Sequence, residues 1–126
     1  MDAANRELSA SFFDAVTAGD LAAVRALCRD DVVLAQNGTV TTLSGLLGFI
    51  TAVRKVAPDM HYENAIRVAT ENGFVEEHDF RGTFADGAMV CIRAVVVATV
   101  VGGKIASMHE YADTAAAAPL LKALGQ

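Results

Sequence analysis

The sequence has few basic residues and no cluster of them. Its 126 residues include 10 Lys and Arg against 15 Asp and Glu, which gives a formal net charge of −5 at pH 7. A protein that binds the phosphate backbone of a nucleic acid needs a basic patch or stripe, and the sequence shows none. We therefore expect no nucleic-acid partner.

Cysteine is scarce as well. Cys28 and Cys91 are the only two, and they form no CxxC or other metal-type spacing. Free thiols of this kind are typical of a reducing compartment. The three histidines, His61, His78 and His109, fall in three different predicted strands, which argues against a metal triad. We expect neither a metal ion nor a cofactor.

Long apolar runs are also missing. The run Ala94–Ala98 ends at Thr99 and is far shorter than the roughly 20 residues of a membrane-spanning helix. The opening stretch MDAANRELSASFF has no basic segment followed by an apolar one, which a secretory signal would have. We expect a cytoplasmic protein with no membrane partner.

The composition and the spacing of apolar residues predict a folded, globular chain. Hydrophobic residues make up 53% and charged residues 20%, which is typical of globular proteins. The length suits one domain, residues 1–126. Leu8, Phe12 and Val16 recur at helical spacing, and the first 29 residues predict two helices. Leu43–Val56 predicts a third helix, and a last one is expected at roughly 114–124.

Strands dominate the second half. A short strand, VVLAQ, ends at the turn signal Asn37-Gly38. From Met60 the apolar period is two, and glycine-containing turns separate four stretches, which predicts an antiparallel meander. The predicted strands are 60–70, 74–84, 88–101 and 104–112. Helices on one face of a long sheet form an α+β fold, and a sheet curled around the third helix leaves a cone with room for a small ligand.

This order of elements, with AGDLAAVRALCRDDVVL early and GKIASMHEYAD late, resembles the SnoaL-like and ketosteroid-isomerase-like group of the nuclear transport factor two-like superfamily. The resemblance covers about residues 5–122. It implies a cone-shaped barrel made of a curved antiparallel sheet wrapped around N-terminal helices. It does not select a function, because the superfamily contains isomerases, epoxide hydrolases, dehydratases, cyclases and non-catalytic binding domains.

A further resemblance, to limonene-epoxide-hydrolase-like members, implies which face of each strand lines the pocket. Such members carry an Arg-x-Asp pair on the strand that matches 74–84 and a second Asp on the strand that matches 104–112. The side chains implied to point inward are Val75, Glu77, Asp79, Arg81, Met108, Glu110 and Ala112, together with His61, Glu63, Ala65, Cys91, Arg93, Val95 and Val97.

The same register implies an outer face. Glu76, His78 and Phe80 would lie there, so His78 is expected to be a surface or interface histidine and not a catalytic one. An apolar row on the next strand, from Val90 through Ile92, Ala94 and Val96 to Ala98, would share that face. Such a row is too apolar to stay in contact with water. We therefore expect a homodimer that covers it.

Ketosteroid-isomerase chemistry itself is not expected. That reaction needs a carboxylate base and an oxyanion hole. At the positions that match the base, the pocket acid and the tyrosine, this chain has Gln36, Val95 and Phe12. None of the three can move the proton or stabilise the enolate.

General acid–base catalysis by carboxylates remains open. Two carboxyl groups in a dry pocket raise the pKa of one of them, which provides an acid and a base near neutral pH. Asp79 and Glu110 are the leading pair, with Glu63 in reserve and Glu77 as a further acid. Arg93 or Arg81 would be the electrostatic partner, and His61 and Gln36 would hold substrate or water. The expected pocket residues are Phe12, Leu34, Gln36, Val95, Val97 and Met108.

The sequence thus predicts a small enzyme that acts without a cofactor on an apolar small molecule, as an isomerase, an epoxide hydrolase or cyclase, or a dehydratase. A second interpretation is a non-catalytic ligand-binding or dimerisation domain of the same fold. In that case Glu77, Asp79 and Arg81 would form a salt-bridged row on a sheet face.

Overall fold

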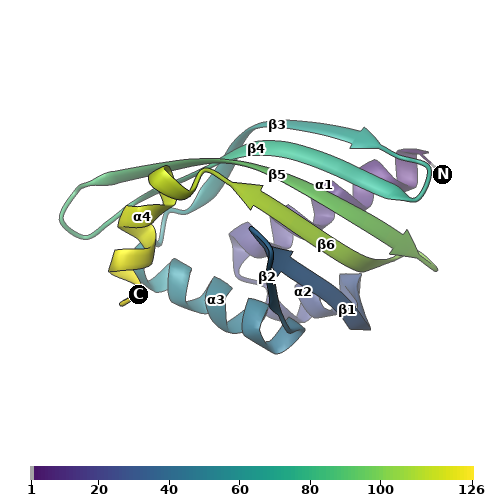
Figure 1. Cartoon of the computed structure of the whole chain (residues 1–126), viewed down its shortest axis with the longest axis horizontal. Coiled ribbons are helices and arrows are strands. Elements are labelled where there is room, and N and C mark those ends of the chain that lie inside the picture. The colour runs from purple at the N-terminus through teal and green to yellow at the C-terminus, as the bar shows by residue number, and fades with distance from the viewer. Residues whose placement is uncertain (1) are drawn as a thin grey trace.

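A computed structural model describes residues 2–126. Helices come first and a long sheet follows (Figure 1), as the sequence predicted. The elements are α1 (Asp2–Ala18), α2 (Leu21–Leu27), β1 (Cys28–Gln36), β2 (Thr39–Thr41), α3 (Leu43–Val56), β3 (His61–Ala69), β4 (Gly73–Thr83), β5 (Met89–Val101), β6 (Lys104–Ala112) and α4 (Thr114–Ala123).

The sheet has six strands in the order β2-β1-β6-β5-β4-β3. Strands β3 to β6 form the expected antiparallel meander, whereas β1 joins β6 in parallel. Figure 1 shows the long strands arched above α3, with α4 at one end of the arch. The sheet is curved but not closed, since β2 and β3 are its edges. The predicted α+β fold, with helices packed on one face of a long curved sheet, is confirmed.

Side-chain caps fix where three of the helices begin. Asp20 accepts a hydrogen bond from the backbone N–H of Ala23 at 3.1 Å, Thr42 from Gly45 at 3.0 Å and Asp113 from Ala116 at 3.2 Å. Each satisfies a donor that has no partner inside its helix. Along residues 2–126, no helix is both long and apolar enough to cross a membrane.

Strand register shows which side chains share a face of the sheet. Residues paired directly across neighbouring strands point to the same side of the sheet. One row of such partners crosses all six strands. Glu76 and Val96 in this row are 0% and 1% exposed, so the row faces the helices. From β3 to β2 the row reads Arg67, Glu76, Val96, Glu110, Gln36 and Thr39.

The faces assigned to β4 and β5 from the sequence are therefore wrong. Phe74, Glu76, His78 and Phe80 of β4 are buried on the inner face. The apolar row of β5 is buried with them inside a single chain and is not an outer face awaiting a partner. Its members are Val90, Ile92, Ala94, Val96 and Ala98. The alternate positions, including Glu77, Asp79, Arg81, Arg93, Val95 and Val97, lie on the outer face.

One extra residue in β6 accounts for the reversal. Next to the Gly102-Gly103 turn, Val101 pairs with Lys104 and Val100 with Ile105, but Thr99 then pairs with Ser107. Ala106 is the unpaired residue of a β-bulge. Without it the hairpin would set Glu110 opposite Val95 and so turn the odd-numbered residues of β5 and β4 inward. A one-residue shift moves every side chain of a strand to the other face.

Candidate functional site

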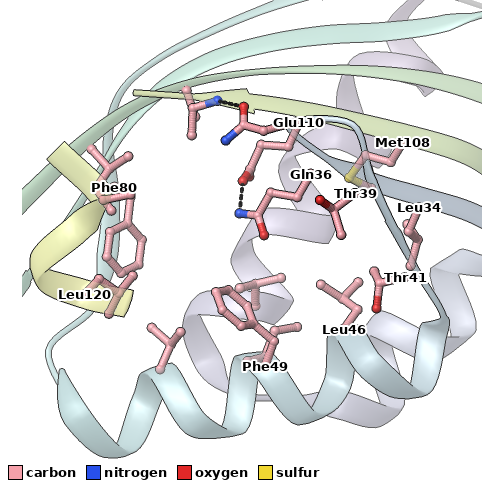
Figure 2. A pocket seen from close by; sticks show the side chains of 18 of the residues that line it. Leu34, Gln36, Thr39, Thr41, Leu46, Phe49, Phe80, Met108, Glu110 and Leu120 are labelled. Atoms are coloured by element: carbon pink, nitrogen blue, oxygen red, sulfur yellow. Dashed lines mark hydrogen bonds between the residues drawn. The ribbon is translucent and has the colours of Figure 1, made fainter. Parts of the chain in front are cut away.

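A cavity of about 570 Å³ lies between the inner face of the sheet and the helices. Its volume is within the range of small-molecule sites. Within the described residues, no Lys or Arg side chain lines it. Most of its wall is apolar (Figure 2), and the larger apolar contributors are Phe12, Phe13, Phe49, Phe80, Met60, Met108, Leu34, Leu46 and Leu120.

Glu110 brings a carboxyl group into this apolar cavity. Gln36 Nε2 donates a hydrogen bond to Glu110 Oε1 at 2.5 Å (Figure 2). The two residues are direct partners in the parallel pairing of β1 and β6. Asn37 holds the strands together here, because its backbone N–H donates to the Glu110 carbonyl at 2.8 Å and its Oδ1 accepts from the Ala112 N–H at 3.0 Å.

The surroundings of Glu110 alter its proton affinity. Burial raises the pKa of the Glu110 carboxyl above its usual range, and the hydrogen bond from Gln36 and the nearby His78 only partly oppose that rise. The raised pKa moves this group toward the pH range in which general acids and bases work best. Glu110 is therefore a titratable group suited to proton transfer inside the cavity.

His78 is the second titratable side chain of the cavity wall. It is 1% exposed and comes from β4, on the inner face. Its Nδ1 lies 2.6 Å from Oε2 of Glu76. Its ring packs against the rings of Phe13 and Tyr62, with centroids 4.8 Å and 4.4 Å away. Within residues 2–126 no hydrogen bond is made to Nε2, so this is the ring nitrogen left for a ligand.

Tyr62 adds a hydroxyl to the same wall. Burial, and then the neighbouring carboxyl groups of Glu110 and Glu76, raise the pKa of Tyr62 above its usual range. The phenol therefore stays neutral and can donate a hydrogen bond. Together the cavity offers a carboxyl, an imidazole and a phenol in otherwise apolar surroundings.

Six of the residues expected to form or line the pocket do so. These are Phe12, Leu34, Gln36, Met108, Glu110 and Ala112. Val95 and Val97 do not line the cavity, and Val97 is 41% exposed on the outer face. The difference again follows from the bulge at Ala106, which reversed β5 but left the inner residues of β6 as expected.

The structure does not bring Asp79 and Glu110 together. Asp79 lies on the outer face, where Arg93 Nε donates to its Oδ1 at 3.0 Å and Asn64 Nδ2 to its Oδ2 at 2.9 Å. The hydrogen bond from Arg93, then that from Asn64, holds the pKa of Asp79 below its usual range. A carboxylate so stabilised is a poor proton donor near neutral pH.

The other expected catalytic groups form a network on the same outer face. His61 Nε2 lies 2.6 Å from Oε2 of Glu63, and Arg81 Nε lies 3.4 Å from that oxygen. The backbone carbonyl of Asp59 and then the Glu63 carboxylate raise the pKa of His61. Glu77 is exposed on this face. Like Asp79 and Arg93, these residues lie across the sheet from the cavity, and no geometry supports their catalytic assignment.

His78, Tyr62 and the buried Glu76 were missed as site residues. A signal for them was present, because His78 and Glu76 alternate with Phe74 and Phe80, whereas the other face of that strand carries Glu77, Asp79 and Arg81. Within residues 2–126, no group of three His, Cys, Asp or Glu side chains is arranged to hold a metal ion.

The family model of the SnoaL-like domain matches residues 10–108. No curated protein has a significant sequence match to the chain.

Among solved structures, AclR from Streptomyces galilaeus, provisionally assigned as a hydroxylase, superposes with a TM-score of 0.82 at 19% identity over 98% of this chain and 82% of that one. IdmH from Streptomyces antibioticus, provisionally assigned as a polyketide cyclase, gives 0.78 at 22% identity, covering 95% and 97%. An NTF2-like protein from Burkholderia xenovorans gives 0.78 at 19%, covering 94% and 96%. At these identities the structures establish the fold alone.

Proposed function

Because the chain belongs to the SnoaL-like domain family, we propose that it catalyses proton transfer, without a cofactor, in a cyclisation or isomerisation of a neutral, largely apolar small molecule. The observation that carries the proposal is the carboxyl group of Glu110, held by Gln36 in an apolar cavity that His78 also lines. A carboxyl and an imidazole facing one cavity can serve as acid and base toward a single substrate.

The roles follow from the hydrogen bonds. His78 Nε2 accepts a proton from a substrate carbon next to a carbonyl group, since Nδ1 is occupied by Glu76. Glu110, protonated, donates to the carbonyl oxygen on which the negative charge collects, and Tyr62 is a second donor nearby. The enolate then either regains the proton at another carbon, which is an isomerisation, or attacks a second carbonyl carbon whose oxygen takes the proton, which is a cyclisation.

The cavity also restricts the substrate. Its titratable wall groups are a carboxyl, an imidazole and a phenol, and no Lys or Arg of the described chain lines it. An anionic substrate would enter an apolar space beside a carboxyl group without a counter-ion, which is costly. A neutral ketone or polyketone fits this wall, and the provisional assignment of IdmH as a polyketide cyclase agrees with that class.

A simple ketone tests the chemistry. 2-Tetralone is a neutral bicyclic ketone with exchangeable protons beside its carbonyl, and their replacement by deuterium can be followed by NMR. We expect the protein to accelerate this exchange above the buffer rate, and Glu110→Gln and His78→Phe each to lose about 10²-fold or more of that acceleration. Asp79→Asn should retain it, since Asp79 lies on the outer face.

Retained exchange in both cavity variants would contradict the assignment. Binding of 2-tetralone without any exchange would favour the second interpretation, a ligand-binding domain, because an apolar cavity with one polar anchor is sufficient for binding.

We still propose a homodimer, but through the outer face of the sheet as the structure defines it and not through the buried Val90–Ala98 row. Two adjacent rows of the outer face carry exposed apolar side chains, and a patch of this kind across four strands favours a partner. Its most exposed members are Ile66, Val68, Val97 and Tyr111. Light scattering should give twice the chain mass, and Val97→Arg should give the monomer mass.

The unpaired Cys28 and Cys91 support the cytoplasm as the location.

A further inference from the structure

Glu76 is a fully buried carboxylate that the chemistry above does not use directly. It is 0% exposed, and three polar or charged partners from three different elements surround it. Ser9 Oγ of α1 donates to Oε1 at 2.8 Å, Arg67 Nε of β3 lies 2.5 Å from the same oxygen, and His78 Nδ1 lies 2.6 Å from Oε2. Burying a charge is unfavourable unless it is paired. Glu76 has a hydrogen bond from Ser9, an ion pair with Arg67 and a close contact with His78, although the Nε–H of Arg67 makes no hydrogen bond within residues 2–126.

The two oxygens of Glu76 have different partners. Oε1 faces Arg67 and Ser9, and among residues 2–126 Oε2 contacts His78 alone. Arginine is always a donor and keeps its charge, so it stabilises Glu76 as a carboxylate. An ionised carboxylate can only accept hydrogen bonds. The proton of a neutral His78 must therefore be on Nδ1, which leaves the lone pair on Nε2.

We propose that Glu76 is a positioning residue that holds His78, which lines the cavity, in the tautomer with the lone pair on Nε2, with Arg67 and Ser9 fixing which oxygen of Glu76 the imidazole meets. The inference deepens the proposed function and rests on it. It adds three residues, Glu76, Arg67 and Ser9, that do not line the cavity and act through His78 alone.

The side chains packed around the His78 ring also fix the orientation of the imidazole. Phe13 lies one helical turn after Ser9 on α1, and its ring meets the His78 ring edge-on at 4.8 Å. Tyr62 packs against the ring from β3 at 4.4 Å. One segment of α1 thus both holds the orienting carboxylate and restricts the imidazole plane. A stability role alone would not require this arrangement, because buried ion pairs are often replaced by apolar side chains at no loss of stability.

The substitution Glu76→Gln makes the inference testable because it preserves shape. The hydroxyl of Ser9 donates to Oε1 in the wild type and the guanidinium of Arg67 lies beside the same oxygen, so both would retain the amide oxygen at that position. The amide –NH2 would then face His78 Nδ1, and Nδ1 would have to accept. His78 should switch to the Nε2–H tautomer and present a donor to the cavity instead of a base.

Histidine tautomers can be read without any substrate, from long-range ¹H–¹⁵N correlations of the imidazole nitrogens in ¹⁵N-histidine-labelled protein. We expect the Nδ1–H form for wild-type His78 and the Nε2–H form in Glu76→Gln. Glu77→Gln is the matched control, the same change one residue away on the outer face, and it should leave the tautomer unchanged. An Nε2–H tautomer in the wild type, which needs no variant to fold, would overturn the proposal, as would an unchanged tautomer in folded Glu76→Gln.

Exchange of 2-tetralone separates this proposal from the proposed function. Glu76→Gln should lower kcat by on the order of 10²-fold with little change in KM, as expected for a base in the wrong tautomer. If the wild type has the Nδ1–H form but catalyses no exchange, the positioning is correct and the proposed reaction is wrong. If exchange depends on His78 but not on Glu76, the reaction is correct and the positioning is wrong.

Discussion

Replacing Glu110 by glutamine should increase the free energy of unfolding at neutral pH. The folded state raises the pKa of Glu110, chiefly through burial, so the folded protein binds a proton that the unfolded chain releases. Below about pH 4 both states are protonated and the group has no effect on stability. As the pH rises toward the folded-state pKa, the wild type loses stability that Glu110→Gln does not lose.

Thermal denaturation across pH measures this difference. The stability gain of Glu110→Gln should be present at pH 7.5 and absent at pH 3.5. A gain that does not depend on pH would show that burial of the charge is not its cause. Together with a loss of exchange activity, a gain in stability would mark Glu110 as a residue retained for function at a cost in stability.

Individual side chains also show where sequence reasoning succeeded. Glu110 and Met108 were placed in the cavity correctly because β6 keeps its alternation from Ser107 to Ala112, and Gln36 because it pairs directly with Glu110. His78 was assigned to the surface and is among the most buried side chains of the chain. A charged or titratable residue can be buried only when partners satisfy it, and those of Glu76 and His78 include Ser9, about 70 positions earlier, which no local pattern shows.

At the scale of elements, the helices and strands were predictable and their faces were not. The turns at Gly73, Gly87 and Gly102 lie where the sequence placed them, and the strand bounds agree within a few residues. The short β2 was not foreseen. The resemblance implied the wrong face of β5, although the Val90–Ala98 row of that strand is apolar and Arg93 is not. Hydrophobic alternation alone would have placed that row inside.

The β-bulge explains why register cannot be read from hairpin turns by counting. Ala106 is followed by Ser107 and preceded by Ile105, and nothing in IAS distinguishes a bulge from a regular strand. Its effect passes across the meander, since β5 and β4 pair without interruption from Gly73–Thr99 to Thr83–Met89. One unpaired residue in β6 therefore determines whether His78 or Asp79 faces the cavity.

For the whole molecule, the distribution of charge around the cavity predicts selectivity for neutral ligands. 2-Naphthamide and 2-naphthoate have nearly the same shape and differ by one negative charge. We expect the amide to bind at least about tenfold more tightly, which corresponds to roughly 1.4 kcal/mol, because the lining provides Glu110 and no Lys or Arg in the described chain. Naphthalene fluorescence reports both affinities. Glu110→Gln should reduce the difference, and equal affinities for the wild type would contradict the prediction.

The pairing of β1 with β6 has a consequence for how activity arises during folding. Gln36 and Glu110 are 74 residues apart in sequence, and Ser9 and Glu76 are 67 apart, whereas β3 to β6 are joined by local hairpins. Contacts between distant residues carry the larger entropic cost of loop closure. A partly folded chain that has only the meander would contain Glu110, Glu76 and His78 but neither Gln36, the hydrogen-bond partner of Glu110, nor Ser9, the partner of Glu76. If the proposed reaction is correct, we expect activity to require the docking of β1 and α1 onto the meander, and an isolated meander to carry the proposed acid and base without it.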